Sequence, residues 1–379
     1  MKKFITILSI GAVLLGCVKE EKIVIQQFTE PGSEEFTNAD YYAQLRAYKE
    51  SDHILSYVFM GRYATLEGAA NLNIEYTTME HRFIALPDSL DIVNLWMGAP
   101  TDQEHSDFCW FRNGEPDYQF DFSPSAYDDM QYCRRVKGTR FVLHADASHW
   151  GQQFQLIDEV EKDGVMVKDT TVWTLSKNKQ DTHEAYAEFL YRKCLAYNID
   201  GLDFDYEGWG EKQINWVVDY LATKMGPNAE TEEGKKLLLI VDYWSSVPPT
   251  NCWNKCDYIV RQAYSVQSGY SSNSALASPG DPKKYIICEQ WEQGSPLNFT
   301  QGGKRWTDPS TNEFGEDLYS MEAYALFCKN GGGKGFGAYY IDNDYKYSVT
   351  SARGTFPTYG YLRNAIRAAN PISTVSNEE

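Results

Sequence analysis

The segment Asn198-Ile-Asp-Gly-Leu-Asp-Phe-Asp-Tyr-Glu-Gly208 alternates acidic with apolar side chains. Its last three acidic positions are Asp203, Asp205 and Glu207. Side chains at positions i, i+2 and i+4 of a β-strand share one face. The pattern therefore predicts a strand with three carboxylates on one face and apolar side chains on the other. Glu207 is expected to lie highest toward the end of the strand.

This acidic strand is the fourth of eight short apolar runs, and helical patterns separate most of them. Alternating strands and helices favour a parallel sheet covered by helices, and eight repeats favour a closed barrel. The helical patterns include Thr182–Ala196, Lys212–Lys224 and Ser320–Lys329. The predicted strands are Ile54–Met60, Ile92–Met97, Arg140–Ala145, Gly201–Tyr206, Lys236–Tyr243, Tyr258–Tyr264, Lys284–Glu289 and Gly335–Ile341. We therefore predict an α/β fold, a (β/α)8 TIM barrel with loop insertions, whose chemistry lies at the carboxyl ends of the strands.

The N-terminus resembles a bacterial lipoprotein signal. Lys2 and Lys3 precede an apolar stretch, Phe4–Leu15, which ends at Gly16-Cys17. The stretch is too short and wrongly flanked for a membrane span. We expect residues 1–16 to be a signal peptide and residues 17–39 to be a flexible tether with a lipidated Cys17. The charged tract that follows Cys17 resembles those of surface lipoproteins, so we expect a lipid-anchored, surface-exposed protein of the cell outer membrane.

The remainder of the chain is expected to form one catalytic domain. An amphipathic pattern at Asp40–Ser51 predicts a helix that leads into it, and no linker divides residues 53–368. We therefore expect residues 40–370 to form one catalytic barrel. The segment Phe154–Ser176 alternates around Asp163-Gly164, which predicts an inserted hairpin. Surface decoration and a substrate-binding arm are equally compatible with that hairpin. We expect residues 371–379 to form a disordered tail.

Composition excludes some classes of function. The chain has 35 basic and 53 acidic residues, and removal of Lys2 and Lys3 with the signal leaves a net charge of −20. Such acidity disfavours nucleic-acid binding. If Cys17 carries lipid, seven Cys remain, an odd number that argues against a disulfide framework. Cys252 and Cys256 lack the partners of a zinc site, and we predict no metal and no cofactor.

Three carboxylates on one buried face are costly as structure but useful as chemistry. Neighbouring charges and burial both raise carboxyl pKa values, so one group can stay protonated as an acid while another is ionised. The alternative is an acidic strand that faces solvent or binds a cation, of which calcium is the main candidate.

The segment Asp200–Glu207 matches the DGxDxDxE signature of glycoside hydrolase family 18, the family of chitinases and endo-β-N-acetylglucosaminidases. The resemblance implies that Glu207 protonates the glycosidic oxygen. The 2-acetamido oxygen of the substrate then attacks the anomeric carbon, and no protein nucleophile is used. Asp205 would orient the acetamido group, and Asp203 would hydrogen-bond Asp205 and tune its proton. Retention of configuration would follow.

Two further segments resemble the family. Gln262-Ala-Tyr264 ends the sixth strand, where chitinases typically carry Met-x-Tyr and N-glycan-releasing enzymes carry Gln-x-Tyr. The resemblance implies that Tyr264 bonds the acetamido carbonyl and that Gln262 bonds the sugar or the intermediate. Without the family, ordinary barrel residues are an equally good interpretation of both. Tyr339 aligns with the aromatic floor beneath the sugar. Trp244 and Trp291 are candidate sugar platforms, and a place in a lid or in the core is an equally good interpretation of each.

The third strand departs from the family, since it reads Val142–Asp146 where chitinases have a small-residue SxGG motif. We interpret His144 and Asp146 as structural residues. The preferred function is an endo-β-N-acetylglucosaminidase that cuts the GlcNAc-β1,4-GlcNAc core of N-linked glycans. Chitinase or chitooligosaccharide hydrolase is the nearest alternative, and a non-catalytic glycan-binding protein is the second. The expected partners are N-glycans of glycoproteins and glycan-uptake proteins at the cell surface, with the membrane contacted by the lipid anchor alone, and we expect a monomer.

Overall fold

The computed structural model describes residues 39–61, 63, 79–146, 150–264, 266–268, 276–291 and 301–371. The predicted signal peptide with Cys17, the tether up to residue 38 and the tail from residue 372 lie outside the described residues. None of the described helices is long and apolar enough to cross a membrane.

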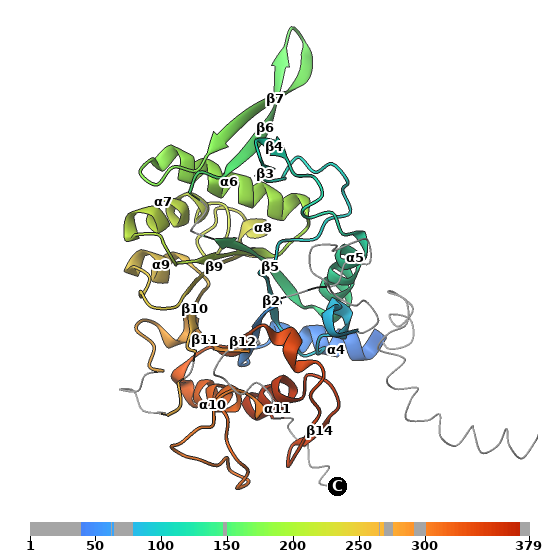
Figure 1. The fold of residues 1–379 in the computed structure, drawn as a ribbon, viewed down its shortest axis with the longest axis vertical. Helices are drawn as coiled ribbons and strands as arrows, with labels where there is room; N and C mark the ends of the chain where they lie inside the picture. The colour runs from blue at the N-terminus through green and yellow to red at the C-terminus, as the bar shows by residue number, and fades with distance from the viewer. Residues whose placement is uncertain are drawn as a thin grey trace, which may run out of the picture.

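Eight parallel strands close into a barrel in the order β1-β12-β11-β10-β9-β8-β5-β2 (Figure 1). Neighbouring strands in the chain lie beside each other in space, which is the arrangement of a (β/α)8 barrel. The strands are β1 Leu55–Phe59, β2 Ile92–Leu95, β5 Arg140–Asp146, β8 Gly201–Asp205, β9 Leu238–Tyr243, β10 Tyr258–Gln262, β11 Tyr285–Gln290 and β12 Gly335–Tyr339. The predicted α/β barrel is confirmed, and each of the eight predicted strands coincides with one of these.

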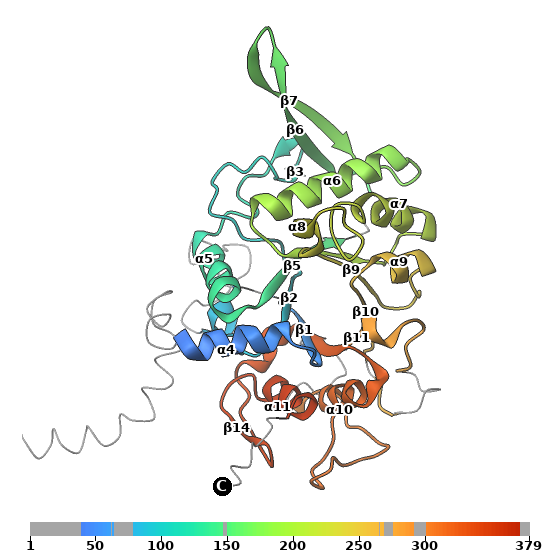
Figure 2. The same ribbon diagram turned by 180° about the vertical axis from the view of Figure 1, so that it is seen from behind.

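Helices surround the barrel, as the views from both sides show (Figures 1 and 2). Helices form at all four predicted segments, with ends that shift by up to three residues. The helices are α4 Ala39–Glu50, α5 Pro124–Tyr132, α6 Gln180–Ala196, α7 Glu211–Leu221, α8 Glu232–Lys235, α9 Thr250–Lys255, α10 Ser320–Phe327 and α11 Gly360–Ala369. Two π-helical segments, Cys133–Lys137 and Cys328–Gly332, extend α5 and α10. Short 3₁₀ turns cover Met79–His81, Phe83–Ala85, Pro282–Lys284 and Ile341–Asp344.

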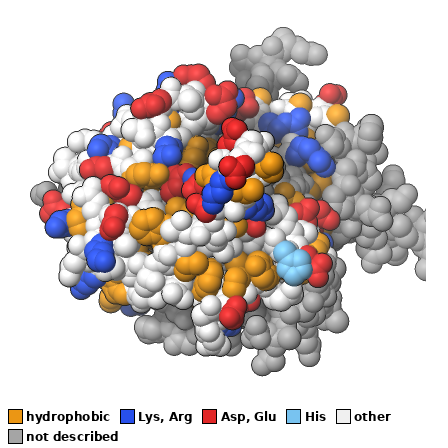
Figure 3. Space-filling model, turned by 90° about the horizontal axis from the view of Figure 1, so that it is seen from above, with side chains coloured by type: hydrophobic (Ala, Val, Ile, Leu, Met, Phe, Trp, Pro, Cys, Tyr) orange, Lys and Arg blue, Asp and Glu red, His pale blue; other side chains and the backbone are white. Residues whose placement is uncertain are grey.

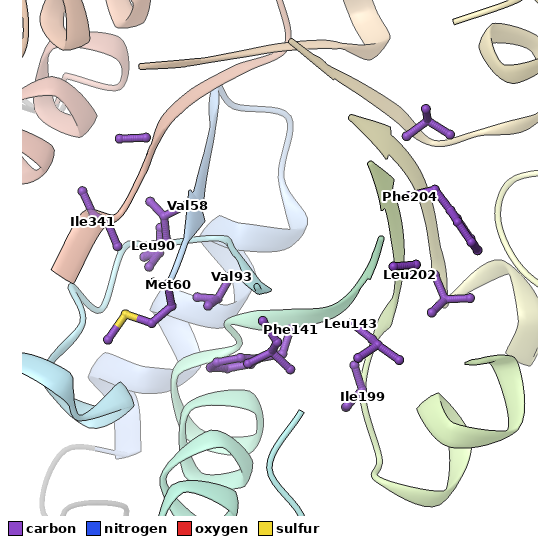
Figure 4. Packing of buried hydrophobic residues seen from close by; sticks show 14 of the residues in the cluster. Val58, Met60, Leu90, Val93, Phe141, Leu143, Ile199, Leu202, Phe204 and Ile341 are labelled. Atoms are coloured by element: carbon purple, nitrogen blue, oxygen red, sulfur yellow. The ribbon is translucent and has the colours of Figure 1, made fainter. Parts of the chain in front are cut away.

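The strands separate two apolar layers, because alternate side chains point to opposite faces. Inside the barrel, Tyr57, Ile240, Val260 and Cys288 belong to a small cluster of buried residues. The larger cluster fills the space between strands and helices, and Figure 4 shows ten labelled members of it. The labelled residues are Val58, Met60, Leu90, Val93, Phe141, Leu143, Ile199, Leu202, Phe204 and Ile341. The parity of a position along its strand therefore tells whether its side chain faces the barrel axis.

Asp200 and Gly201 fix the amino end of β8. Asp200 Oδ2 accepts hydrogen bonds from the Phe141 backbone N–H and from Arg134 Nε, both at 2.8 Å, and Arg134 Nη2 donates to Oδ1 at 2.6 Å. Gly201 has φ +155°, and a Cβ there would lie 2.2 Å from the Leu238 carbonyl oxygen. Only glycine fits this approach of β8 to β9.

The predicted insertion is an antiparallel hairpin of β6, Gln153–Lys162, and β7, Val165–Thr174. Its turn residues Asp163 and Gly164 both have positive φ, as a tight hairpin turn requires. The hairpin projects away from the barrel beyond α6 (Figures 1 and 2). Two smaller hairpins pair β3 Phe111–Arg112 with β4 Glu115–Pro116, and β13 Val349–Ser351 with β14 Gly354–Phe356.

Candidate active site

A pocket of about 200 Å³ opens at the carboxyl ends of the barrel strands. Seven of the eight strands, or the residues that follow them, contribute side chains to it. The lining residues are Phe59, Trp96, His144, Asp205, Glu207, Asp242, Gln262, Tyr264 and Tyr339. Active sites of such barrels lie at this end, so this pocket is the candidate site.

The three carboxyls of the acidic strand β8 point toward the pocket, as the alternation of acidic and apolar residues predicts. Asp203 lies deepest and is fully buried, whereas Asp205 and Glu207 are partly exposed and line the pocket. β8 ends at Asp205, but the Tyr206 N–H still donates to the Asp242 carbonyl oxygen at 2.7 Å. This bond carries the strand alternation one step further and leaves Glu207 at the mouth.

Asp203 is held by donors from two other strands. Its Oδ2 accepts hydrogen bonds from the Tyr57 hydroxyl and from Asn94 Nδ2, the latter at 2.8 Å. Asn94 also donates to the Tyr57 hydroxyl oxygen at 2.9 Å and lies 3.4 Å from His144 Nδ1. Burial raises the pKa of Asp203 to about 6, although both donors favour its ionised form.

Asp242 brings a fourth carboxyl to the cluster from β9. It is fully buried, and its Oδ2 accepts a hydrogen bond from Gln262 Nε2 at 2.8 Å. The same nitrogen lies 3.5 Å from Asp205 Oδ1. Burial raises the pKa of Asp242 well above its ordinary value, and the charges of Asp203 and Asp205 add to the effect. Burial and the neighbouring charges therefore favour the neutral form of Asp242.

Aromatic rings form one side of the pocket. Tyr264 and Tyr339 stack with centroids 6.1 Å apart, and Trp96 meets Tyr339 edge-on at 5.2 Å. Burial raises the pKa of Tyr264 well above its usual range, so its hydroxyl remains protonated. A phenol beside a flat aromatic face can bind one hydroxyl or carbonyl of a sugar while the ring stacks on its apolar side.

The structure thus brings together six sequence-predicted residues: Asp203, Asp205, Glu207, Gln262, Tyr264 and Tyr339. Two others lie elsewhere. Trp291 is fully buried, contacts Tyr361 edge-on at 5.7 Å, and does not line the pocket. It follows Gln290 on the outward face of β11, so the structure places it with the core residues and away from the pocket. Trp244 is 58% exposed and lines a separate pocket of about 160 Å³ with Arg261 and Val247.

Sequence reasoning missed six residues that line the pocket or contact its carboxylates: Tyr57, Phe59, Asn94, Trp96, His144 and Asp242. Asn94 and Asp242 are single polar residues inside apolar runs, at the parity that faces the barrel axis. That signal could have identified them, because a buried polar side chain on this face needs a partner there. His144, which we interpreted as structural, lines the pocket. The side chain of Asp146 lies outside the described residues.

The described residues contain no group of three or more His, Cys, Asp or Glu side chains arranged to hold a metal ion. The seven described cysteines are buried and unpaired.

A family model described as the endo-beta-N-acetylglucosaminidase EndoS TIM-barrel domain matches residues 148–338, which is half of the chain. The chain belongs to this family. The residues that the EndoS family model matches run from β6 to β12 and include the acidic strand, Asp242, Gln262 and Tyr264. No curated protein sequence matches the chain.

Solved structures share the fold of this EndoS-type barrel. One is a mutant endo-β-N-acetylglucosaminidase from Cordyceps militaris in complex with fucosyl-N-acetylglucosamine-Asn. Its identity is 19% over 87% of this chain and 95% of that chain, with a TM-score of 0.50. Another is a family 18 chitinase from the chitin utilization locus of Flavobacterium johnsoniae, with 14% identity over 84% and 94% of the two chains and a TM-score of 0.43. The likeness to the Cordyceps structure shows a shared barrel fold.

Proposed function

We propose that this protein is an endo-β-N-acetylglucosaminidase that hydrolyses the GlcNAc-β1,4-GlcNAc core of N-linked glycans with retention of configuration. The observation that carries the proposal is the pocket in which Glu207 and Asp205 face Gln262, Tyr264 and Tyr339. The family model supports the reaction class, and the fucosyl-N-acetylglucosamine-Asn in the Cordyceps complex supports the substrate class.

In this mechanism, Glu207 donates its proton to the glycosidic oxygen as the bond to the leaving sugar breaks. The acetamido carbonyl oxygen of the bound N-acetylglucosamine attacks the anomeric carbon and forms an oxazolinium ring. Glu207 then takes a proton from the water that opens the ring. Its place at the mouth of the pocket, two residues beyond Asp205, suits both steps because solvent reaches it there.

Asp205 acts on the acetamido group rather than on the glycosidic oxygen. An anion beside the acetamido nitrogen holds the group in place and stabilises the positive charge that develops during ring closure. The Tyr264 hydroxyl would donate to the acetamido carbonyl oxygen, and Tyr339 would stack beneath the sugar ring. Asp203 lies two residues before Asp205 on the same face of β8, and Tyr57 and Asn94 hold its Oδ2.

Mass spectrometry of a glycoprotein such as ribonuclease or an immunoglobulin tests this proposal. We expect the mature protein to leave a single N-acetylglucosamine on Asn. Glu207→Gln should lower turnover by about 10³-fold, within the range for loss of a general acid, while the glycan still binds. Glu211→Gln, an exposed acid at the start of α7, is the matched control and should keep wild-type turnover.

Other outcomes separate the alternatives. If the glycoprotein is unchanged but chitin oligomers are shortened, the protein is a chitinase. Binding of glycans without cleavage of either substrate would indicate a non-catalytic glycan-binding protein. Wild-type turnover in Glu207→Gln would refute the assignment of the acid.

We further propose that Cys17 carries a lipid that anchors the enzyme at the surface of the outer membrane. The sequence of the N-terminus supports this proposal. Protease treatment of whole cells tests it, since an enzyme on the outer face is digested without lysis and a periplasmic one is not.

A further inference from the structure

Two carboxyl oxygens at the base of the pocket have no hydrogen-bond partner. Asp203 Oδ1 and Asp242 Oδ1 are both buried and unpaired among the described residues. Both residues are fully buried and interact with each other across neighbouring strands. Two ionised carboxylates in this arrangement would leave two orphan acceptors of like charge, which is costly. A single proton shared by the pair removes the repulsion and satisfies both oxygens.

The donors around the pair decide where that proton resides. Asp203 Oδ2 accepts hydrogen bonds from Tyr57 and Asn94, whereas Asp242 Oδ2 accepts one from Gln262. A carboxyl with more donors is more stable as an anion. The proton therefore belongs to Asp242, whose hydroxyl would donate to Asp203.

Asp242 also fixes the amide of Gln262. Because Oδ2 of Asp242 is an acceptor, the side-chain nitrogen of Gln262 must face it, at 2.8 Å. The nitrogen then also lies toward Asp205 Oδ1, at 3.5 Å. The amide oxygen of Gln262 must point the other way and is available as an acceptor for a substrate hydroxyl.

We propose that Asp242 is a positioning residue that holds the shared proton of the carboxyl cluster and sets the orientation of Gln262, so that Asp205 remains an anion aimed at the acetamido group. The inference rests on the proposed function and names a residue that the acidic motif does not contain. Asp242 acts through Gln262, Asp203 and Asp205 and does not itself need to touch the scissile bond.

The charged and titratable groups that face Asp242 come from five strands or the residues that follow them. They are Tyr57 of β1, Asp203, Asp205 and Glu207 on or after β8, Tyr264 after β10, Cys288 of β11 and His144 of β5. Three of them are carboxyls, so loss of the Asp242 proton at high pH would add a charge beside three others. Activity should then fall on the alkaline side.

Two substitutions separate the neutral role of Asp242 from an anionic one. Asp242→Asn keeps the shape, offers a carbonyl oxygen to Gln262 and an amide N–H to Asp203, and cannot lose a proton. Asp242→Leu removes both interactions and continues the apolar layer of Ile240. We would measure kcat and KM for both variants from pH 5 to 9, on whichever of a short N-glycopeptide and a chitin oligomer the wild type cleaves.

We expect Asp242→Asn to retain kcat within about threefold at pH 6 and to lose activity at a higher pH than the wild type does. Asp242→Leu should lower kcat by about 10²-fold at every pH, the size of losing one preorganised group at a transition state, with a smaller change in KM. Equal losses in both variants would show that an anion is required, and no loss in either would remove Asp242 from the mechanism.

Infrared spectroscopy keeps the inference testable if the Leu variant does not fold or if the wild type cleaves neither substrate. A protonated carboxylic acid has a C=O stretch distinct from that of a carboxylate. Other buried acids such as Asp344 contribute to this band at pH 7 in both proteins, so we expect the band of Asp242 in the difference spectrum of the wild type minus Asp242→Asn. Absence of the band would overturn the inference whatever the enzyme cleaves, whereas failure of cleavage alone would count against the proposed function.

Discussion

Some residues of the acidic motif stabilise the barrel, and others line the pocket. Asp200 lies at the amino end of β8, where it binds Arg134 and the Phe141 N–H, far along the strand from the pocket. Asp205 and Glu207 lie at the opposite end and line the pocket. The motif therefore places a structural carboxylate at the amino end of the barrel strand and the pocket-lining carboxyls at its carboxyl end. This is the usual division between stability and chemistry in this fold.

Gly201 offers a direct test of how closely β8 approaches β9. Gly201→Ala would place Cβ 2.2 Å from the Leu238 carbonyl oxygen at φ +155°, so backbone must move. We expect the free energy of unfolding to fall by about 3 kcal/mol, from strain and overpacking together. Gly151→Ala is the matched control, since Gly151 has φ +83° with open space around it. It should cost about 1 kcal/mol.

Urea unfolding followed by tryptophan fluorescence measures both variants. Equal destabilisation would mean that positive φ alone requires glycine at these positions and that the contact with Leu238 relaxes freely. A larger loss in Gly201→Ala shows that the close approach of the strands adds its own cost.

Much of the candidate site could be predicted from one strand, because parity places Asp203, Asp205 and Glu207 on one face. The role of Asp242 could not be predicted from its own strand. Its importance depends on a neighbour in space, Asp203, that is 39 positions away in the sequence. The sequence left Trp291 open between a sugar platform and a core residue, and in the structure it follows the outward face of β11 and packs against Tyr361.

Among the elements, the barrel strands were predictable because each is a short apolar run between turn signals. The helices were less predictable, because α8 and α9 are only four and six residues long and show no clear helical periodicity of apolar residues. The carboxyl end of β12 also differs from prediction, because Tyr340 adopts φ +57° and stops the strand at Tyr339.

The β6–β7 hairpin is an element whose outer half touches little of the barrel. Its outer apolar side chains Val165 and Met166 are about 60% exposed, and no hairpin residue lines the catalytic pocket. We expect deletion of residues 159–168, with Asp158 and Asp169 joined by Asn-Gly, to leave stability and cleavage of a short glycopeptide unchanged. A two-residue Asn-Gly loop suits the pairing of Asp158 with Asp169.

Thermal unfolding and kcat/KM check this deletion. Trp173→Ala at the base of the hairpin is the contrasting variant, because Trp173 packs against the core, and it should lower stability by about 2 kcal/mol. Slower cleavage of the short glycopeptide by the deletion variant would contradict our expectation. If only cleavage of an intact glycoprotein slows, the hairpin is a substrate-binding arm rather than decoration.

At the scale of the whole molecule, the charge of −18 is compatible with a neutral substrate. Figure 3 shows acidic and basic side chains interspersed with hydrophobic ones on the hairpin side. A field of one sign steers charged ligands and leaves neutral sugars unaffected. Recognition of a neutral glycan then depends on aromatic faces and hydrogen bonds, which the pocket around Tyr264 and Tyr339 supplies.

The fold as a whole should lose stability between pH 4 and pH 7. Burial raises the pKa of Asp203 and Asp257 to about 6 and that of Asp344 to about 7, from an ordinary value of 3.8. The folded state therefore binds more protons than the unfolded state in this range. The stability that these groups contribute is complete below about pH 4 and is lost as pH rises through 6 and 7, by at most about 1.4 kcal/mol per pH unit for each group. Carboxyls whose pKa is lowered in the folded state, such as Asp88, contribute stability that is lost only at lower pH, as the pH falls through their folded pKa.

Asp344→Asn isolates one of these contributions. Asp344 is the fully buried last residue of the 3₁₀ turn Ile341–Asp344. Its carboxyl accepts the Leu362 N–H in the first turn of α11 at 2.9 Å, and an Asn carbonyl oxygen can accept the same bond. We expect the stability of the variant relative to wild type to rise steadily from pH 4.5 to 7 and to level off above pH 7, because only the wild type must ionise a buried acid. Urea unfolding at a series of pH values measures the difference, with the exposed Asp163→Asn as control. A stability difference that stays constant with pH would mean that Asp344 titrates at its ordinary value, and the decline of the wild type would then have to come from Asp203 and Asp257.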